Sequence, residues 1–182
     1  MKKDIPRYGI AQSIREIVFG LEDSLVSTLG ALTGIAVGTH NTFFVILSGF
    51  VIIASECTSM AAGSYLSSKS AYETERALRV QEGKEFSQEE RPVRGAIVMG
   101  ISYVLGGFIP LLPYFFLSIS QAIILSVPLT AIVLFLVGVW SSRYTKRSAI
   151  RSGMEMVSVS LIAALFGYLI ALSVNWYFGV RV

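Results

Sequence analysis

Residues 95–142 form a stretch of 48 residues without a single Asp, Glu, Lys or Arg. A second uncharged stretch of 25 residues, 156–180, lies near the end of the chain. A helix that crosses a bilayer needs about 20 apolar residues, and no soluble core needs runs this long. Only 15% of the 182 residues are charged, against about 25% in soluble domains. The sequence therefore excludes a disordered chain, a disulfide-rich secreted scaffold and an ordinary cytosolic enzyme. It predicts a multi-pass membrane protein.

We predict an all-α integral membrane protein that forms one domain over residues 1–182, with five transmembrane helices. His40 and Asn41 form a short turn between the first two helices, and prolines with a polar segment divide the long uncharged stretch in two. The predicted spans are residues 17–38, 42–67, 96–117, 121–141 and 153–178. Residues 68–95 are predicted to form a short, charged, helical cytoplasmic loop, whose first helix ends at Gly83.

The distribution of basic residues predicts the orientation. If the five spans alternate in direction, 14 of the 15 Lys and Arg residues fall on one side of the membrane. Cytoplasmic loops carry an excess of Lys and Arg, so we expect a cytoplasmic N-terminus and a C-terminus outside. The same bias accounts for the net charge of +3, so the basic balance does not indicate a nucleic-acid partner.

Four acidic residues fall within or at the edge of predicted spans: Glu22, Asp23, Glu56 and Glu155. A carboxylate at the centre of a bilayer costs about 2.5–3.5 kcal/mol on insertion scales. Such residues normally face the interior of a helix bundle and mark an ion or proton pathway. Each is therefore a candidate functional residue. For Glu155, an ion pair with Arg147 or Arg151 is the favoured alternative.

Asp23 lies about 12 Å along the first span from Arg15. Its helical face continues through small residues: Ser27, Gly30, Gly34 and Gly38. Small residues at this spacing form a seam on which another helix packs closely, so Asp23 is expected to face protein. Glu22 lies about 100° around the helix and cannot share that face. A structural ion pair near the interface is an equal alternative for Glu22.

Glu56, Met60, Gly63 and Ser67 share one face of the second span. Met60 lies about 13 Å from the cytoplasmic edge, level with Asp23, and Glu56 lies one turn deeper at about 20 Å. A carboxylate with a thioether suits Fe²⁺ or Mn²⁺ better than Mg²⁺ or Ca²⁺, which prefer oxygen ligands. Protons compete with metal for carboxylates held away from water, which favours proton-for-metal exchange.

One chain offers few ligands at this level. Two copies of the chain packed on the glycine seam of the first span would double them. We therefore expect a homodimer with the ion pathway at its interface.

At these residues the sequence resembles the vacuolar iron transporter family, the iron and manganese transporters of plant and yeast vacuoles and their prokaryotic relatives. Four segments carry the resemblance in order: EDSLVSTLG at 22–30, SMAAGSYLS at 59–67, GGFIPLLPY at 106–114 and RSGMEM at 151–156. The resemblance implies a five-span homodimer that exports Fe²⁺ and Mn²⁺ from the cytosol by proton antiport. Co²⁺ and Zn²⁺ are further candidate ions, and no tightly bound cofactor is implied.

The resemblance also assigns roles to residues. Asp23 and Met60 correspond to pathway ligands of the family, and Glu56 is an additional carboxylate of this chain. Ser64 stands where many relatives have Glu. Plant-type members carry a longer cytoplasmic domain, rich in Glu and Met, between spans two and three, whereas residues 68–95 contain no Met.

The short loop still offers Glu82 and Glu85 as a candidate metal-loading pair. It also favours a prokaryote-like protein of the cell membrane, with the vacuolar membrane as the location in a eukaryote. Two other functions stay open. A proton-coupled exporter of organic cations would need an aromatic-lined cavity around the acids, and a membrane sensor or scaffold would bind metal without moving it. An intramembrane enzyme is disfavoured because no nucleophile–base pair lies in the spans.

Overall fold

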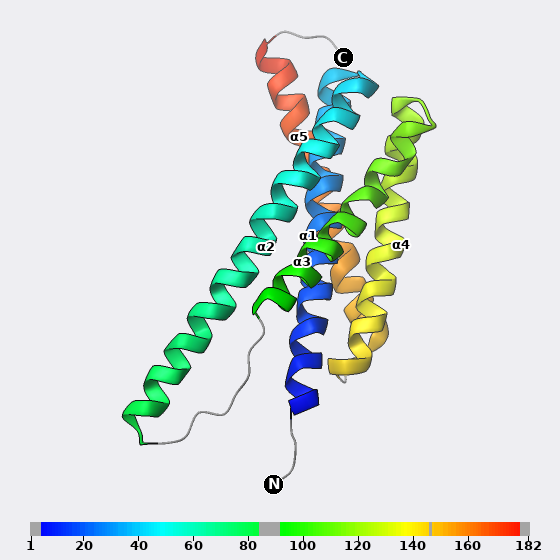
Figure 1. Cartoon of the computed structure of the whole chain (residues 1–182). Helices are drawn as coiled ribbons and strands as arrows, with labels where there is room; N and C mark the ends of the chain where they lie inside the picture. Colours follow the sequence, from blue (N-terminus) through cyan, green and yellow to red (C-terminus); the bar gives the residue numbers. More distant parts are fainter. Residues whose placement is uncertain (1–4, 84–91, 146, 179–182) are drawn as a thin grey trace.

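The computed structural model describes residues 5–83, 92–145 and 147–178. These residues form five α-helices and one short 3₁₀ helix: α1 (Ile5–Thr39), α2 (Thr42–Gln81), α3 (Pro92–Leu111), η1 (Leu112–Phe115), α4 (Ile119–Thr145) and α5 (Ala149–Phe178). Helices α1, α3 and α5 run in one direction and α2 and α4 in the other (Figure 1). The predicted all-α class is confirmed for this part of the chain.

Four helical segments are long and apolar enough to cross a membrane: α2, α3 with η1, α4 and α5. The prediction of a multi-pass membrane protein is confirmed. Helix α1 does not meet the same criteria, because Glu22 and Asp23 interrupt its apolar residues. The crossing of α1 and the direction of insertion therefore stay predictions.

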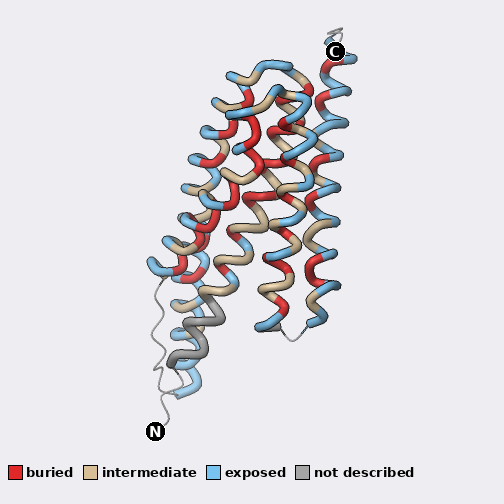
Figure 2. Tube along the Cα trace, turned by 90° about the vertical axis from the view of Figure 1, so that its right-hand side faces the viewer, coloured by how far each residue is buried: buried red, intermediate tan, exposed pale blue. Residues whose placement is uncertain are grey.

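Apolar side chains cover much of the outer surface, as expected for helices that face lipid. Ile97, Ile101 and Leu105 form an exposed row along α3, and Ile132 and Leu136 do the same on α4. Figure 2 shows that buried residues lie on the facing sides of the helices, while exposed ones lie outside. Such a surface is far more apolar than a soluble monomer tolerates.

The turn between α1 and α2 is well defined. His40 has a left-handed φ of +48°, which reverses the chain. The side-chain oxygen of Asn41 accepts hydrogen bonds from the backbone N–H groups of Phe43 and Phe44, at 2.9 and 3.4 Å. This is an N-terminal helix cap, so the predicted turn at His40 and Asn41 is confirmed. The main buried apolar cluster lies near this end of the bundle and comprises Leu32, Ala36, Val45, Ile53, Leu111, Tyr114 and Ala122.

The glycine seam of α1 is a packing surface, but its partner differs from the one expected. A Cβ added to Gly30 would lie 3.0 Å from the carbonyl oxygen of Ala163, and one added to Gly34 would lie 2.9 Å from that of Gly167. Both contacts are with α5 of the same chain. The seam is therefore covered within one subunit, and the expectation that a second copy packs on it is wrong.

Helix α2 leans away from the bundle in its second half (Figure 1). Its 40 residues extend about 60 Å, twice the thickness of the hydrocarbon core. The helix ends just before Gly83, whose φ of +68° suits glycine. The tilt of α2 opens the space between α1 and α2 that holds the candidate site.

Candidate metal site

The site lies where α1 and α3 pack closely, near Gly106. Tyr103 of α3 is fully buried, and its hydroxyl shares a 2.8 Å hydrogen bond with the hydroxyl of Ser27 on α1. The helices approach this closely because Gly106 faces α1: a Cβ there would overlap the hydroxyl of Ser24. Close packing thus places a phenol beside the acidic face of α1.

Two carboxylates lie within electrostatic range of this phenol. Asp23 of α1 is half-buried, and Glu56 of α2 is exposed. The two carboxylates interact electrostatically with each other, and both act on the Tyr103 hydroxyl. Like charges in a region of low dielectric repel strongly, so a cation or a proton shared between them would stabilise the pair. Three helices therefore bring two carboxylates and a phenol together.

The face of α2 that carries Glu56 is open. Glu56, Gly63 and Ser67 are exposed, and Met60 is half-buried. No described atom lies within 4 Å of a Cβ built on Gly63. The single chain therefore does not enclose Glu56, contrary to the general expectation for acids within a span.

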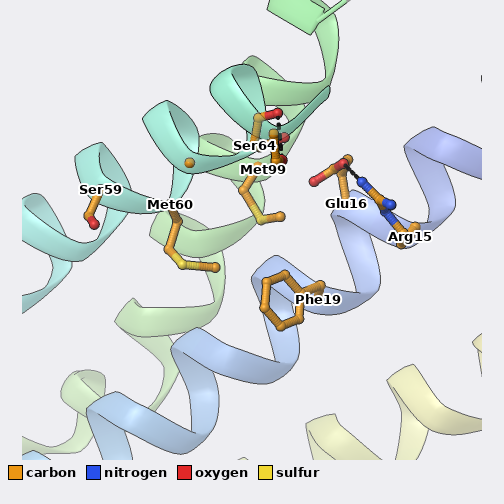
Figure 3. Close-up of a pocket in the computed structure, with 9 residues that line it drawn as sticks. Arg15, Glu16, Phe19, Ser59, Met60, Ser64 and Met99 are labelled. Carbon is orange, nitrogen blue, oxygen red and sulfur yellow. Dashed lines mark hydrogen bonds and ion pairs between the residues drawn. The ribbon is translucent and has the colours of Figure 1, made fainter. Parts of the chain in front are cut away.

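A cavity of about 560 Å³ lies between α1, α2 and α3, towards the start of α1 (Figure 3). The thioethers of Met60 and Met99 point into this space, opposite Phe19 and Glu16. Glu16 is almost completely buried and forms a 2.8 Å ion pair with Arg15. The remaining lining residues are small or polar: Ser59, Gly63, Ser64 and Ser67.

The neighbours expected from depth along the helices differ in part from those in the structure. Counting residues placed Met60 level with Asp23 and Glu56 deeper. In the structure, Glu56 interacts with Asp23, and Met60 lines the cavity with Glu16 and Phe19, nearer the start of α1. Counting assumes parallel helix axes, whereas α2 crosses α1 obliquely (Figure 1).

Glu22 and Glu155 lie on the other side of α1. Both line a separate cavity of about 260 Å³ between α1, α4 and α5. Glu155 is paired with Arg147 at 3.5 Å and with Arg151 at 3.3 Å, as the ion-pair alternative predicted. Asp23 is not among the described residues that line this cavity, so the 100° offset places Glu22 and Asp23 on different sides of α1.

The proposed loading pair is only partly covered by the structure. Glu82 is exposed at the end of α2, where its N–H donates to the carbonyl oxygen of Leu78. Glu85 lies outside the described residues. No described contact joins Glu82 to the Asp23–Glu56 pair or to either cavity.

Sequence reasoning missed three residues of this region. Glu16 lies two helical turns before Asp23, and this seven-residue spacing could have indicated a shared face. Met99 and Tyr103 lie in the long uncharged stretch, where nothing distinguishes them from ordinary core residues. Within residues 5–83, 92–145 and 147–178, no group of three or more His, Cys, Asp or Glu side chains converges. One chain thus supplies two carboxylates, thioethers and hydroxyls.

The chain matches one family model and several known proteins. The model of the VIT family matches residues 14–91 and 79–172. An uncharacterized protein of Methanocaldococcus jannaschii is 27% identical over 170 residues, which cover 86% of this chain and 87% of that protein. Vacuolar iron transporter homolog 2 of Arabidopsis thaliana is 29% identical over 169 residues, covering 91% of this chain and 82% of the relative. Vacuolar iron transporter 1 of the same plant is 34% identical over 95 residues, covering 52% and 38%.

Proposed function

The chain belongs to the VIT family, and from this premise we propose that it transports divalent transition-metal ions across a membrane. The resemblance inferred from the sequence segments is confirmed. The family is one of membrane transporters and not of enzymes. The relatives named vacuolar iron transporter favour Fe²⁺ as the substrate. Mn²⁺ has similar ligand preferences, and we include it.

The observation that supports the proposal is that Asp23 of α1 and Glu56 of α2 lie within electrostatic range of each other. Two adjacent carboxylates in a low-dielectric region bind either protons or a divalent cation. Exchange of one for the other couples metal export from the cytosol to proton import. Tyr103 and Ser27 supply hydroxyl oxygens beside the pair, and Met60 lies on the approach to it.

The pathway is completed by a second copy of the chain in this proposal. Glu56 is exposed in the single chain although it lies in an apolar span, and an uncompensated carboxylate facing lipid is costly. The exposed face of α2 around Gly63 is small enough to admit another helix closely. A homodimer packed on α2 would cover Glu56 and double the ligands. It replaces the dimer on the glycine seam of α1, which α5 covers.

We place the protein in the cell membrane if the organism is a prokaryote and in the vacuolar membrane if it is a eukaryote. The archaeal relative matches almost its whole length, and the plant relatives are named for the vacuole.

Flux measurements test the function. The protein is reconstituted in liposomes, and Fe²⁺ and Mn²⁺ uptake is followed with and without a pH gradient. We expect flux that depends on the gradient and that Asp23→Ala and Met60→Ala abolish. Glu75→Ala is the matched control, because Glu75 is an acid on the exposed end of α2. Metal binding without flux in wild type would instead favour a sensor. Flux of bulky organic cations alone would favour the exporter.

Cross-linking tests the dimer. In a Cys57→Ser background, Ser59→Cys should form an intermolecular disulfide in membranes, because Ser59 lies on the exposed face of α2 beside Glu56. Ile132→Cys on the outer face of α4 is the control and should stay monomeric. Efficient cross-linking at Ile132 with none at Ser59 would place the interface on α4.

A further inference from the structure

We propose that the cavity around Glu16 is a second cation site, at the entrance to the pathway, and that Arg15 occupies its carboxylate until a metal ion displaces it. The carboxylate of Glu16 and the thioethers of Met60 and Met99 would be its ligands. This inference rests on the proposed transport function, because it supplies the step before an ion reaches Asp23. It adds a binding site and a built-in competitor for that site.

Glu16 is an unusual side chain for its position. It is only 1% exposed, whereas its partner Arg15 is 68% exposed. A buried carboxylate is stable only when a cation or several hydrogen bonds compensate its charge. In this structure the Arg15 guanidinium compensates the Glu16 charge, and a metal ion that displaced it would take over that compensation.

Arg15 is a displaceable partner. Consecutive residues on a helix point about 100° apart, so the Arg15 guanidinium reaches Glu16 only by folding its flexible stem around α1. The 2.8 Å contact is with one oxygen of the carboxylate, Oε1. Arg15 is mostly exposed, so its guanidinium regains water when it leaves, and the incoming metal ion then compensates the charge of the buried Glu16 carboxylate. The guanidinium thus acts as a tethered competitor.

The cavity is larger than the ion pair requires. Its volume of about 560 Å³ compares with about 30 Å³ for each water molecule in the liquid, so a partly hydrated ion fits. Two thioethers line it, and thioethers favour softer divalent metals over Mg²⁺ and Ca²⁺. The combination selects the same class of ion as the Asp23–Glu56 pair.

Ser64 provides an independent indication of a missing ligand. Its side chain lines the cavity and is 7% exposed. The Ser64 hydroxyl oxygen is buried without a hydrogen-bond partner among the described residues. A buried hydroxyl in that state costs stability unless something binds it. A metal ion or its bound water in the cavity would satisfy this oxygen.

The position of Glu16 suits an entrance. It lies two helical turns, about 10 Å, before Asp23 along α1. Met60 borders the cavity and lies one turn of α2 from Glu56. An ion released from Glu16 therefore has Met60 as its next ligand before the two carboxylates. Arg15 would return to Glu16 behind it.

Mn²⁺ binding distinguishes the two partners of the pair, because they should respond in opposite directions. Free Mn²⁺ is counted by electron paramagnetic resonance with the full chain in detergent, in an Asp23→Ala background that removes the deeper site. We expect Glu16→Gln to lose the remaining Mn²⁺ binding. We expect Arg15→Gln to lower the dissociation constant for Mn²⁺ about three- to tenfold, because the guanidinium then no longer occupies the Glu16 carboxylate in part of the molecules.

Matched controls separate this effect from a change in overall charge. Arg79→Gln removes the arginine of the ion pair with Glu75, at 3.0 Å on the exposed end of α2, and should leave Mn²⁺ affinity unchanged. If Arg15→Gln does not fold, Arg15→Lys replaces it. Lysine competes less well for a carboxylate than the planar guanidinium, so the dissociation constant should still fall.

The inference is overturned if Glu16→Gln binds Mn²⁺ as well as its parent does, or if removing Arg15 weakens binding. Either result would make the pair purely structural. Failure of the transport proposal looks different: wild type would then show no flux, while binding at Glu16 persists. Intact flux with no Glu16-dependent binding would reject only the second site.

Discussion

Two sides of helix α1 differ in how tightly they pack. Towards α5, Gly30 and Gly34 bring backbone against backbone, with carbonyl oxygens of Ala163 and Gly167 at about the closest distance that a Cβ could tolerate. Towards α2, the same helix presents Glu16 and the Asp23 carboxylate to a cavity and to an open face. The first side excludes every other molecule, and the second leaves room for an ion.

The contrast shows how a small membrane protein can carry charges in a span. Van der Waals packing between small residues holds α1 firmly to α5. Helix α2 packs mainly on α3 and leans away from α1 in its second half (Figure 1). The tight contact of α1 with α5 thus leaves the acidic side of α1 towards α2 open.

Gly167→Leu should break the rigid side. A Cβ at Gly167 would overlap the carbonyl oxygen of Gly30, and backbone cannot rotate away as a side chain can. Overpacking usually costs about 1–3 kcal/mol and occasionally more, so we expect the upper end of this range or loss of folded protein. Thermal unfolding in detergent measures it. Unchanged stability would show that α1 and α5 can separate without cost.

Gly63→Leu should leave the chain folded but disturb the open side. No described atom lies within 4 Å of a Cβ there, so the unfolding free energy of the monomer should change by no more than about 0.5 kcal/mol. The same change should prevent Ser59→Cys cross-linking and reduce Mn²⁺ flux, because a second copy would meet the new side chain. Normal cross-linking and flux together would argue against a dimer on α2.

Tyr103→Phe should weaken the packing of α3 on α1 by a moderate amount. It removes the hydrogen bond to Ser27, and such a bond contributes about 0.5–1.5 kcal/mol. A double-mutant cycle with Ser27→Ala, read by chemical denaturation, isolates the pair. Additive effects of the two substitutions would mean that the hydroxyls do not support each other.

Glu155→Gln should have the smallest effect. Its pairs with Arg147 and Arg151 are exposed, and exposed pairs contribute about 0–1 kcal/mol. We expect a small loss of stability that salt abolishes, with flux at the wild-type level. The measurement is Mn²⁺ flux beside thermal unfolding at low and high salt. A large loss of flux would instead make Glu155 part of the pathway.

The sequence by itself determined the class of the protein. Long uncharged stretches can be satisfied only by helices in a membrane, and this reasoning does not depend on how the helices are arranged. It also indicated Asp23, Met60 and Glu56, because charged and soft ligands are conspicuous in apolar spans. His40 and Asn41 were predictable as a turn since their chemistry is local.

Only the tertiary structure decided which surfaces meet. The glycine seam predicted a close partner, but α5 of the same chain rather than a second copy fills it. The tilt of α2 paired Asp23 with Glu56 and moved Met60 to the cavity with Glu16. Helical periodicity specifies the face on which a residue lies. Crossing angles and depths depend on side-chain packing between segments far apart in the chain, which no local pattern encodes.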